Sequence, residues 1–178
     1  MFSNIFLVCL FVSLYSTGSS FSCKWMTHKF RQYSQNSLTL LDTMGNNSGD
    51  AEEESTVAFP NALYRHAFRA SAEDRLAFVV QILEEITVLF EEDQSSASWE
   101  ETTAENFVNI VTQQAHGLRS CIVSHSHRRR NKKLNMYFKR LSHSQMGHNA
   151  DAWELIRKEV RTHLLIADTL VLSVLTAN

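Results

Sequence analysis

Turn-forming residues are scarce in this 178-residue chain, which contains one proline and five glycines. A protein with many β-strands needs such residues at its turns, so the composition argues against that class and predicts an all-α fold. Long hydrophobic runs are also missing, because no stretch of about twenty apolar residues exists that could form a membrane-spanning helix. A formal net charge of −2 argues against general nucleic-acid binding.

Recognisable catalytic motifs are absent as well. The chain has no Gly-x-Ser-x-Gly nucleophile elbow and no glycine-rich phosphate loop, so nothing in it predicts an enzyme. Cys121, His125 and His127 are residue types that bind zinc, but no fourth ligand is spaced to complete a tetrahedral site. We therefore expect neither a metal nor a cofactor.

The first 22 residues have the pattern of a secretory signal peptide. An apolar run from Ile5 to Tyr15, too short to span a bilayer, is followed by small residues up to Ser22. No Lys or Arg precedes the run, so the terminal amine alone supplies the positive charge that is typical of a signal peptide. The alternative is a buried N-terminal helix, but no periodic polar face accompanies the run. The sequence thus predicts cleavage before Cys23 and a secreted, extracellular single domain of residues 23–178.

Two cysteines, Cys23 and Cys121, belong to the predicted mature domain, because Cys9 leaves with the signal. An even pair in an oxidising compartment predicts one disulfide, with two free buried thiols as the alternative. The bridge would tie the start of the mature chain to the third helical segment. It would close a loop long enough for a chain-entropy contribution approaching about 4–5 kcal/mol.

The first half of the mature domain predicts two long helices separated by a long connection. An apolar side from Trp25 to Met44 indicates the first helix, which Gly45 can end. The polar, acidic loop that follows contains an N-glycosylation acceptor at Asn46. Residues 61–68 indicate a short, irregular turn of helix. A capping pair, Ser71 and Asp74, then opens the second long helix, over about residues 72–90.

The second half predicts three more helices. Ser98 and Glu101 form another capping box, and the third helix continues past Gly117 to about Ile122. A shorter fourth helix begins at Leu134 and ends near Gly147. The last helix lies between Asn149, a candidate N-cap, and Ala177, and its apolar residues follow the spacing of one buried face: Trp153, Ile156, Val160, Leu164, Ala167, Val171 and Val174.

Four long helices, a short extra one and a long first connection indicate a four-helix bundle of the cytokine type. In such bundles a long crossover permits two neighbouring helices to run parallel. On the last helix Arg157, Lys158 and Arg161 cluster on adjacent turns, and we expect a partner there. The basic run 128–133 is either a solvated interhelical loop or a patch for sulfated glycans or an acidic receptor face.

Several segments resemble type I interferons, most closely the two-cysteine kind found in bony fish. They are the start Cys23-Lys24-Trp25-Met26, Phe59-Pro60, residues 107–111 (Phe-Val-Asn-Ile-Val), residues 137–141 (Tyr-Phe-Lys-Arg-Leu) and residues 151–159, which contain Ala152-Trp153. The match spans essentially the whole mature chain, and the aromatic pair followed later by Ala-Trp is its most specific part. The resemblance implies an interferon-like bundle of five helices with a long first crossover loop.

The resemblance also implies a function without catalysis. Such proteins are secreted antiviral cytokines that bring together two chains of a class II cytokine receptor, which starts JAK–STAT signalling and antiviral gene expression. One chain contacts the first helix, the first long loop and the last helix, and the other contacts the second to fourth helices. By motif match Arg157 falls at a receptor contact, and Lys158, Arg161 and Thr162 follow on the same stretch.

Two other functions fit the residues. One is another secreted helical cytokine, which the identity of its receptor would distinguish. The other is a secreted module that binds sulfated glycans through residues 128–133, which salt-sensitive retention on heparin would reveal.

Overall fold

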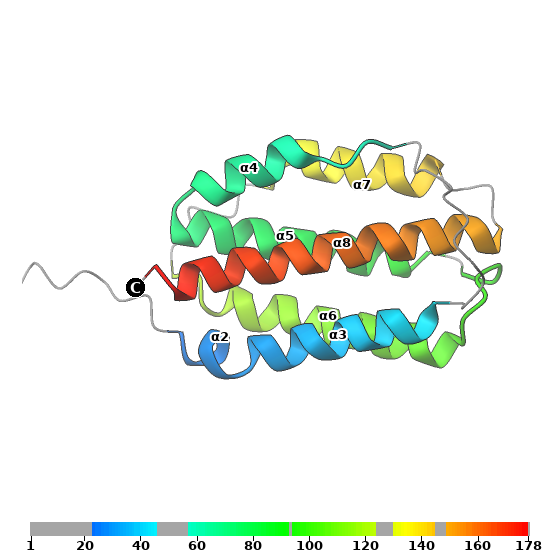
Figure 1. Ribbon diagram of the computed structural model, residues 1–178, viewed down its shortest axis with the longest axis horizontal. Coiled ribbons are helices and arrows are strands. Elements are labelled where there is room, and N and C mark those ends of the chain that lie inside the picture. The colour runs from blue at the N-terminus through cyan, green and yellow to red at the C-terminus, as the bar shows by residue number, and fades with distance from the viewer. Residues whose placement is uncertain (1–22, 46–56, 93, 124–129, 145–148, 178) are drawn as a thin grey trace, which may run out of the picture.

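The computed structural model describes residues 23–45, 57–92, 94–123, 130–144 and 149–177. The predicted signal peptide and Asn46 therefore lie outside the described residues. Within these ranges the chain forms helices and no strand (Figure 1). The helices are α2 (Lys24–His28), α3 (Phe30–Met44), α4 (Asn61–Arg69), α5 (Ala72–Phe90), α6 (Glu101–Arg119), α7 (Lys132–Ser144) and α8 (Ala150–Leu175).

Four long helices, α3, α5, α6 and α8, form the bundle. Helix α3 packs against α6 and α8, and α5 packs against the same two helices. The helices α3 and α5 run in the same direction, as the long first connection predicts, but they occupy diagonal corners (Figure 1). The pairs that touch are therefore antiparallel, and the edge between α3 and α8 lies opposite the edge between α5 and α6.

The predicted apolar faces meet in one continuous core. The seven apolar residues expected on the last helix are all buried, and α5 contributes a broad apolar face that includes Leu76, Val79 and Ile86. Helices α4 and α7 lie over the side of the bundle formed by α5 and α8 (Figure 1). This arrangement leaves the outer faces of α4 and α7 free of other helices.

The start of the domain is fixed to the end of α6. A disulfide joins Cys23 to Cys121, with 5.5 Å between the two Cα atoms. Beside it, a methyl group added at Gly117 would overlap the indole of Trp25, so this glycine permits close packing.

Two helical segments in the first half of the domain differ from the prediction. The first helix is interrupted at Lys29, and its short initial part, α2, turns Met26 into the core while Trp25 lies against α6. Residues 61–69 form a regular helix, α4, where the sequence indicated an irregular turn. Burial of Tyr64 and Ala67 on one face stabilises this short helix, which local sequence preference alone does not predict.

The capping predictions have mixed outcomes. Asn149 caps α8, with its Oδ1 accepting the Ala152 N–H at 2.8 Å, and Ser71 caps α5 through the Asp74 N–H at 3.2 Å. The prediction that Ser98 caps the third helix is wrong, because α6 begins at Glu101 and its N-cap is Glu100. Trp99 instead packs on Phe90 and Trp153, which holds the preceding residues outside the helix.

Candidate functional site

Arg157, the first of the predicted contact residues, is largely enclosed between α8 and the end of α3. Its Nε and Nη2 donate to the two carboxylate oxygens of Glu154 at 2.8 and 2.6 Å, and its Nη1 donates to the Leu41 carbonyl at 3.1 Å. The guanidinium also lies against Gly45, where an added Cβ would come within 2.8 Å of it. The hydrogen bonds to Glu154 raise the pKa of Arg157, so it is a permanent cation that joins α8 to α3.

The other three predicted residues are exposed on α8. Arg161 pairs with Asp42 of α3, with 2.8 Å between Nε and Oδ1, and both side chains remain about half exposed. Lys158 lies one turn earlier, and the Thr162 hydroxyl donates to the Lys158 carbonyl at 3.2 Å. The structure thus brings these three residues together with Asp42 at the edge between α3 and α8.

Two exposed leucines extend this edge toward the end of α8. Leu165 and Leu172 are each 42% exposed, and they follow Lys158 at intervals of seven residues, so they lie on the same helical stripe. Sequence reasoning missed both of them. The spacing of the helix could have revealed them, because Leu165 and Leu172 fall outside the buried face defined by Val160, Leu164 and Val171. We call the exposed residues Lys158, Arg161, Thr162, Leu165 and Leu172 the α8 surface.

A buried chain of polar side chains joins α8 to α4 and α7, on the side of the bundle formed by α5 and α8. His163 is fully buried, and its two ring nitrogens are hydrogen-bonded to Tyr64 of α4 and to Tyr137 of α7, the second contact at 3.0 Å. Tyr137 in turn donates to Glu159. Burial lowers the pKa of His163 to about 3 and raises the pKa of both tyrosines, so the imidazole and both phenols are neutral at physiological pH.

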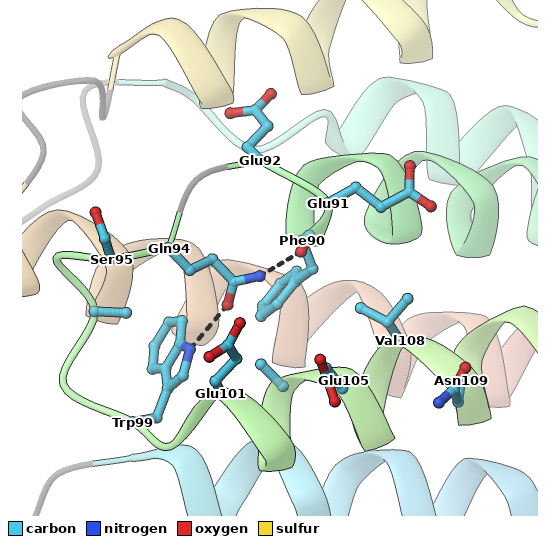
Figure 2. Close-up of a pocket in the computed structure, with 12 residues that line it drawn as sticks. Phe90, Glu91, Glu92, Gln94, Ser95, Trp99, Glu101, Glu105, Val108 and Asn109 are labelled. Carbon is cyan, nitrogen blue, oxygen red and sulfur yellow. Dashed lines mark hydrogen bonds between the residues drawn. The ribbon is translucent and has the colours of Figure 1, made fainter.

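A groove lies at the opposite edge of the bundle, between the end of α5 and the start of α6 (Figure 2). It encloses about 750 Å³. Trp99 forms part of its wall and is held by a 2.9 Å hydrogen bond from its Nε1 to Gln94 Oε1. Four glutamates and no Lys, Arg or His line the groove: Glu91, Glu92, Glu101 and Glu105. Of these, Glu92 directs its carboxylate toward α7, where it accepts from the Ser142 hydroxyl at 2.8 Å. We call these residues and Trp99 the acidic groove, which sequence reasoning did not predict.

Only part of the basic run 128–133 belongs to the described residues. Arg130 donates to buried Glu85 at 2.8 Å, and Asn135 donates to the same carboxylate. The Gln81 amide both accepts from the Asn131 N–H and donates to the Asn131 carbonyl, so α5 fixes the start of α7. Arg130 therefore has a structural partner, whereas Lys132 and Lys133 are exposed on the first turn of α7.

Comparisons with known proteins agree with this architecture. The family model described as "Interferon alpha/beta domain" matches residues 26–174, nearly all of the predicted mature domain. The chain belongs to the interferon alpha/beta family. It is 36% identical to interferon a3 of Oncorhynchus mykiss over 91% of this chain and 93% of that protein. It is also 23% identical to interferon type B of Gallus gallus over 92% of this chain and 85% of that protein.

A solved structure, zebrafish interferon 1, matches this interferon with a TM-score of 0.69 and 27% sequence identity. The match covers 85% of this chain and 99% of that chain. Interferons of this family are cytokines and not enzymes, so the chain is a helical cytokine of the type I interferon kind. None of the described helices is long and apolar enough to cross a membrane.

Proposed function

We propose that this interferon is a secreted antiviral cytokine that brings together two class II cytokine receptor chains and so triggers JAK–STAT signalling and antiviral gene expression. The observation that carries the proposal is the presence of two chemically different exposed surfaces at opposite edges of one bundle. A rigid bundle with two separate contact surfaces binds two chains at once and sets the distance between them.

The α8 surface is proposed to bind the first receptor chain. Partly exposed apolar side chains surrounded by polar ones are typical of interfaces, in which apolar anchors supply most of the energy and charges tune the rate and the choice of partner. Leu165 and Leu172 are suited to the first role, and Lys158, Arg161 and Thr162 to the second. We propose that Arg157 supports this surface by holding the end of α3 against α8.

The acidic groove is proposed to receive the second receptor chain. Its carboxylates favour a partner segment that carries Lys or Arg, while Trp99 offers an aromatic anchor. Because the groove belongs to α5 and α6, its use agrees with the family's pattern, in which the second chain contacts the second to fourth helices.

Two double variants test the assignment of each surface. We expect R161A/L165A to weaken binding to one receptor chain by about tenfold or more, and E101Q/E105Q to weaken binding to the other by a similar factor. Each variant should reduce STAT phosphorylation in cells of the source animal, measured within minutes of adding refolded residues 23–178. Binding to each receptor ectodomain would be measured separately by surface plasmon resonance.

The matched control is R65A/F68A, which removes an exposed arginine and an exposed apolar residue from α4, outside both surfaces. It should leave both affinities and signalling unchanged. If wild-type protein with a helical spectrum gave no STAT phosphorylation at any dose, the proposed function would be wrong. Arg157→Ala is unsuitable as the main test, because losing its buried hydrogen bonds is expected to cost about 2 kcal/mol or more of stability.

The processing of the chain is part of the same proposal. We propose that the signal peptide is removed before Cys23 and that Asn46 is glycosylated. Secretion of the full chain from fish cells, followed by N-terminal sequencing and by peptide-N-glycosidase treatment, tests both points. A mature protein that begins at Met1, or a mass unchanged by the glycosidase, would contradict the respective part.

A further inference from the structure

The outer face of α7 carries two rows of cations. Lys132 and Lys139 are seven residues apart, as are Lys133 and Arg140, so each pair lies on one side of the helix, about 10 Å apart along its axis. All four side chains are exposed. Met136, which is 53% exposed, lies between the rows.

No negative charge offsets these rows on their own helix. Helix α7 contains no Asp or Glu, and neither does α4, which lies on the same side of the bundle. Among the described residues no carboxylate forms an ion pair with any of the four cations. The nearby carboxylates of Glu85 and Glu92 are engaged otherwise: Glu85 binds Arg130, and Glu92 accepts from Ser142 at 2.8 Å. The positive charge of this face is therefore available to an external partner.

We infer that this face of α7 binds a sulfated glycosaminoglycan. Two straight rows of exposed cations match a linear polyanion, and lysine serves as a flexible point charge for sulfate groups. A membrane surface is disfavoured, because Met136 is the one large apolar side chain of α7 that is exposed, while Leu134, Phe138 and Leu141 are buried in the core and cannot insert. A single-stranded nucleic acid is disfavoured because α7 exposes no aromatic side chain for base stacking.

The site shares only Lys132 and Lys133 with the basic run 128–133, because it is centred on the helix and excludes Arg130, which is bound to Glu85. It also differs from the α8 surface and the acidic groove, which lie on other helices. The inference does not depend on receptor binding, and a glycan on α7 leaves the α8 surface open.

Heparin affinity tests the inference with variants of matched composition. K133Q/K139Q/R140Q removes three cations of the α7 face, and the control K24Q/K29Q/R31Q removes two lysines and one arginine that are exposed on and beside α2 and α3. We expect wild type and control to bind a heparin oligosaccharide at about 0.15 M salt. The α7 variant should bind it at least about tenfold more weakly, since each lost cation removes a screened charge interaction.

Two further measurements test whether charge is what determines heparin affinity. K133R/K139R should retain the wild-type affinity, and desulfated heparin should not bind any variant. If the α7 variant and the control lost the same heparin affinity, binding would depend on net charge alone, and the inference would be wrong. It would also be overturned if wild type failed to bind heparin, or if it preferred phosphatidylserine vesicles to heparin.

Discussion

At the scale of single residues, charge and burial compete in this bundle. Arg157 is a charged residue that directly precedes exposed Lys158, yet it is only 9% exposed because Glu154 and the Leu41 carbonyl satisfy its donors. His163 is also buried on α8, among aromatic rings, but burial lowers its pKa to about 3 and it remains neutral, hydrogen-bonded to two phenols. The same helix therefore contains a buried cation and a buried neutral base, and neither changes charge in the folded protein in mildly acidic solution.

His163 is expected to make stability depend on pH. Its pKa is about 3 in the folded protein and about 6.5 when exposed, so the unfolded chain binds a proton first as the pH falls. Its contribution to stability is complete above about pH 6.5 and decreases below it, by about 1.4 kcal/mol per pH unit until about pH 3. Urea unfolding at pH 7.5 and pH 5 would measure this decrease.

Other groups also titrate in this range, so the comparison requires a variant. His163→Gln lowers stability at both pH values, but it removes the proton uptake of the unfolded imidazole. The loss between pH 7.5 and pH 5 should then be smaller than in wild type by about 2 kcal/mol. An identical loss in both proteins would contradict a neutral, buried His163.

At the scale of helices, contact between α2 and α6 depends on one missing side chain. The indole of Trp25 occupies the space where a Cβ of Gly117 would lie, and it also packs against Phe30 and Tyr33. Glycine within a helix costs about 1 kcal/mol relative to alanine. The residue is therefore locally unfavourable, and close packing of two helices compensates for it.

Gly117→Ala is expected to lower the free energy of unfolding by about 1–3 kcal/mol, because displacing the indole costs more than the gain in helix propensity. In a Trp25→Leu background the added methyl group has room, and the same change should be neutral or stabilising. Thermal or urea unfolding of the four proteins gives the coupling directly. If Gly117→Ala stabilised the protein with Trp25 intact, close packing would not be its reason.

At the scale of the whole molecule, the disulfide connects segments 98 residues apart in the sequence. It joins the beginning of α2 to the end of α6, next to the contact between Trp25 and Gly117. The cross-link thus reinforces packing that the apolar residues already provide. Its main effect is expected in the unfolded chain, which loses conformational freedom.

Reduction, or the double change C23S/C121S, is expected to lower the free energy of unfolding by about 2–5 kcal/mol. The protein should remain helical, because the other apolar residues of α3, α5, α6 and α8 still form a continuous core without the bridge. Urea unfolding followed by circular dichroism measures the difference, and hydrogen exchange should show the largest loss of protection in α2. Unchanged stability after complete reduction would contradict this role.

Much of the fold followed from the sequence alone. The few glycines and prolines set the all-α class, and the spacing of apolar residues located the long helices, because burial of one face imposes a period of 3.6 residues. The Asn149 and Ser71 caps were also evident, since capping is local. The segments that match the family carried the interferon assignment, which the comparisons confirmed.

Tertiary structure decided what depends on residues distant in the sequence. It enclosed Arg157, joined Tyr64, His163 and Tyr137, and moved the start of α6 past Ser98 because Trp99 packs on Phe90 and Trp153. It also formed the acidic groove and left Leu165 and Leu172 exposed. Local patterns specify which faces are apolar, but only packing of the complete bundle determines which polar groups are buried and which apolar side chains remain outside.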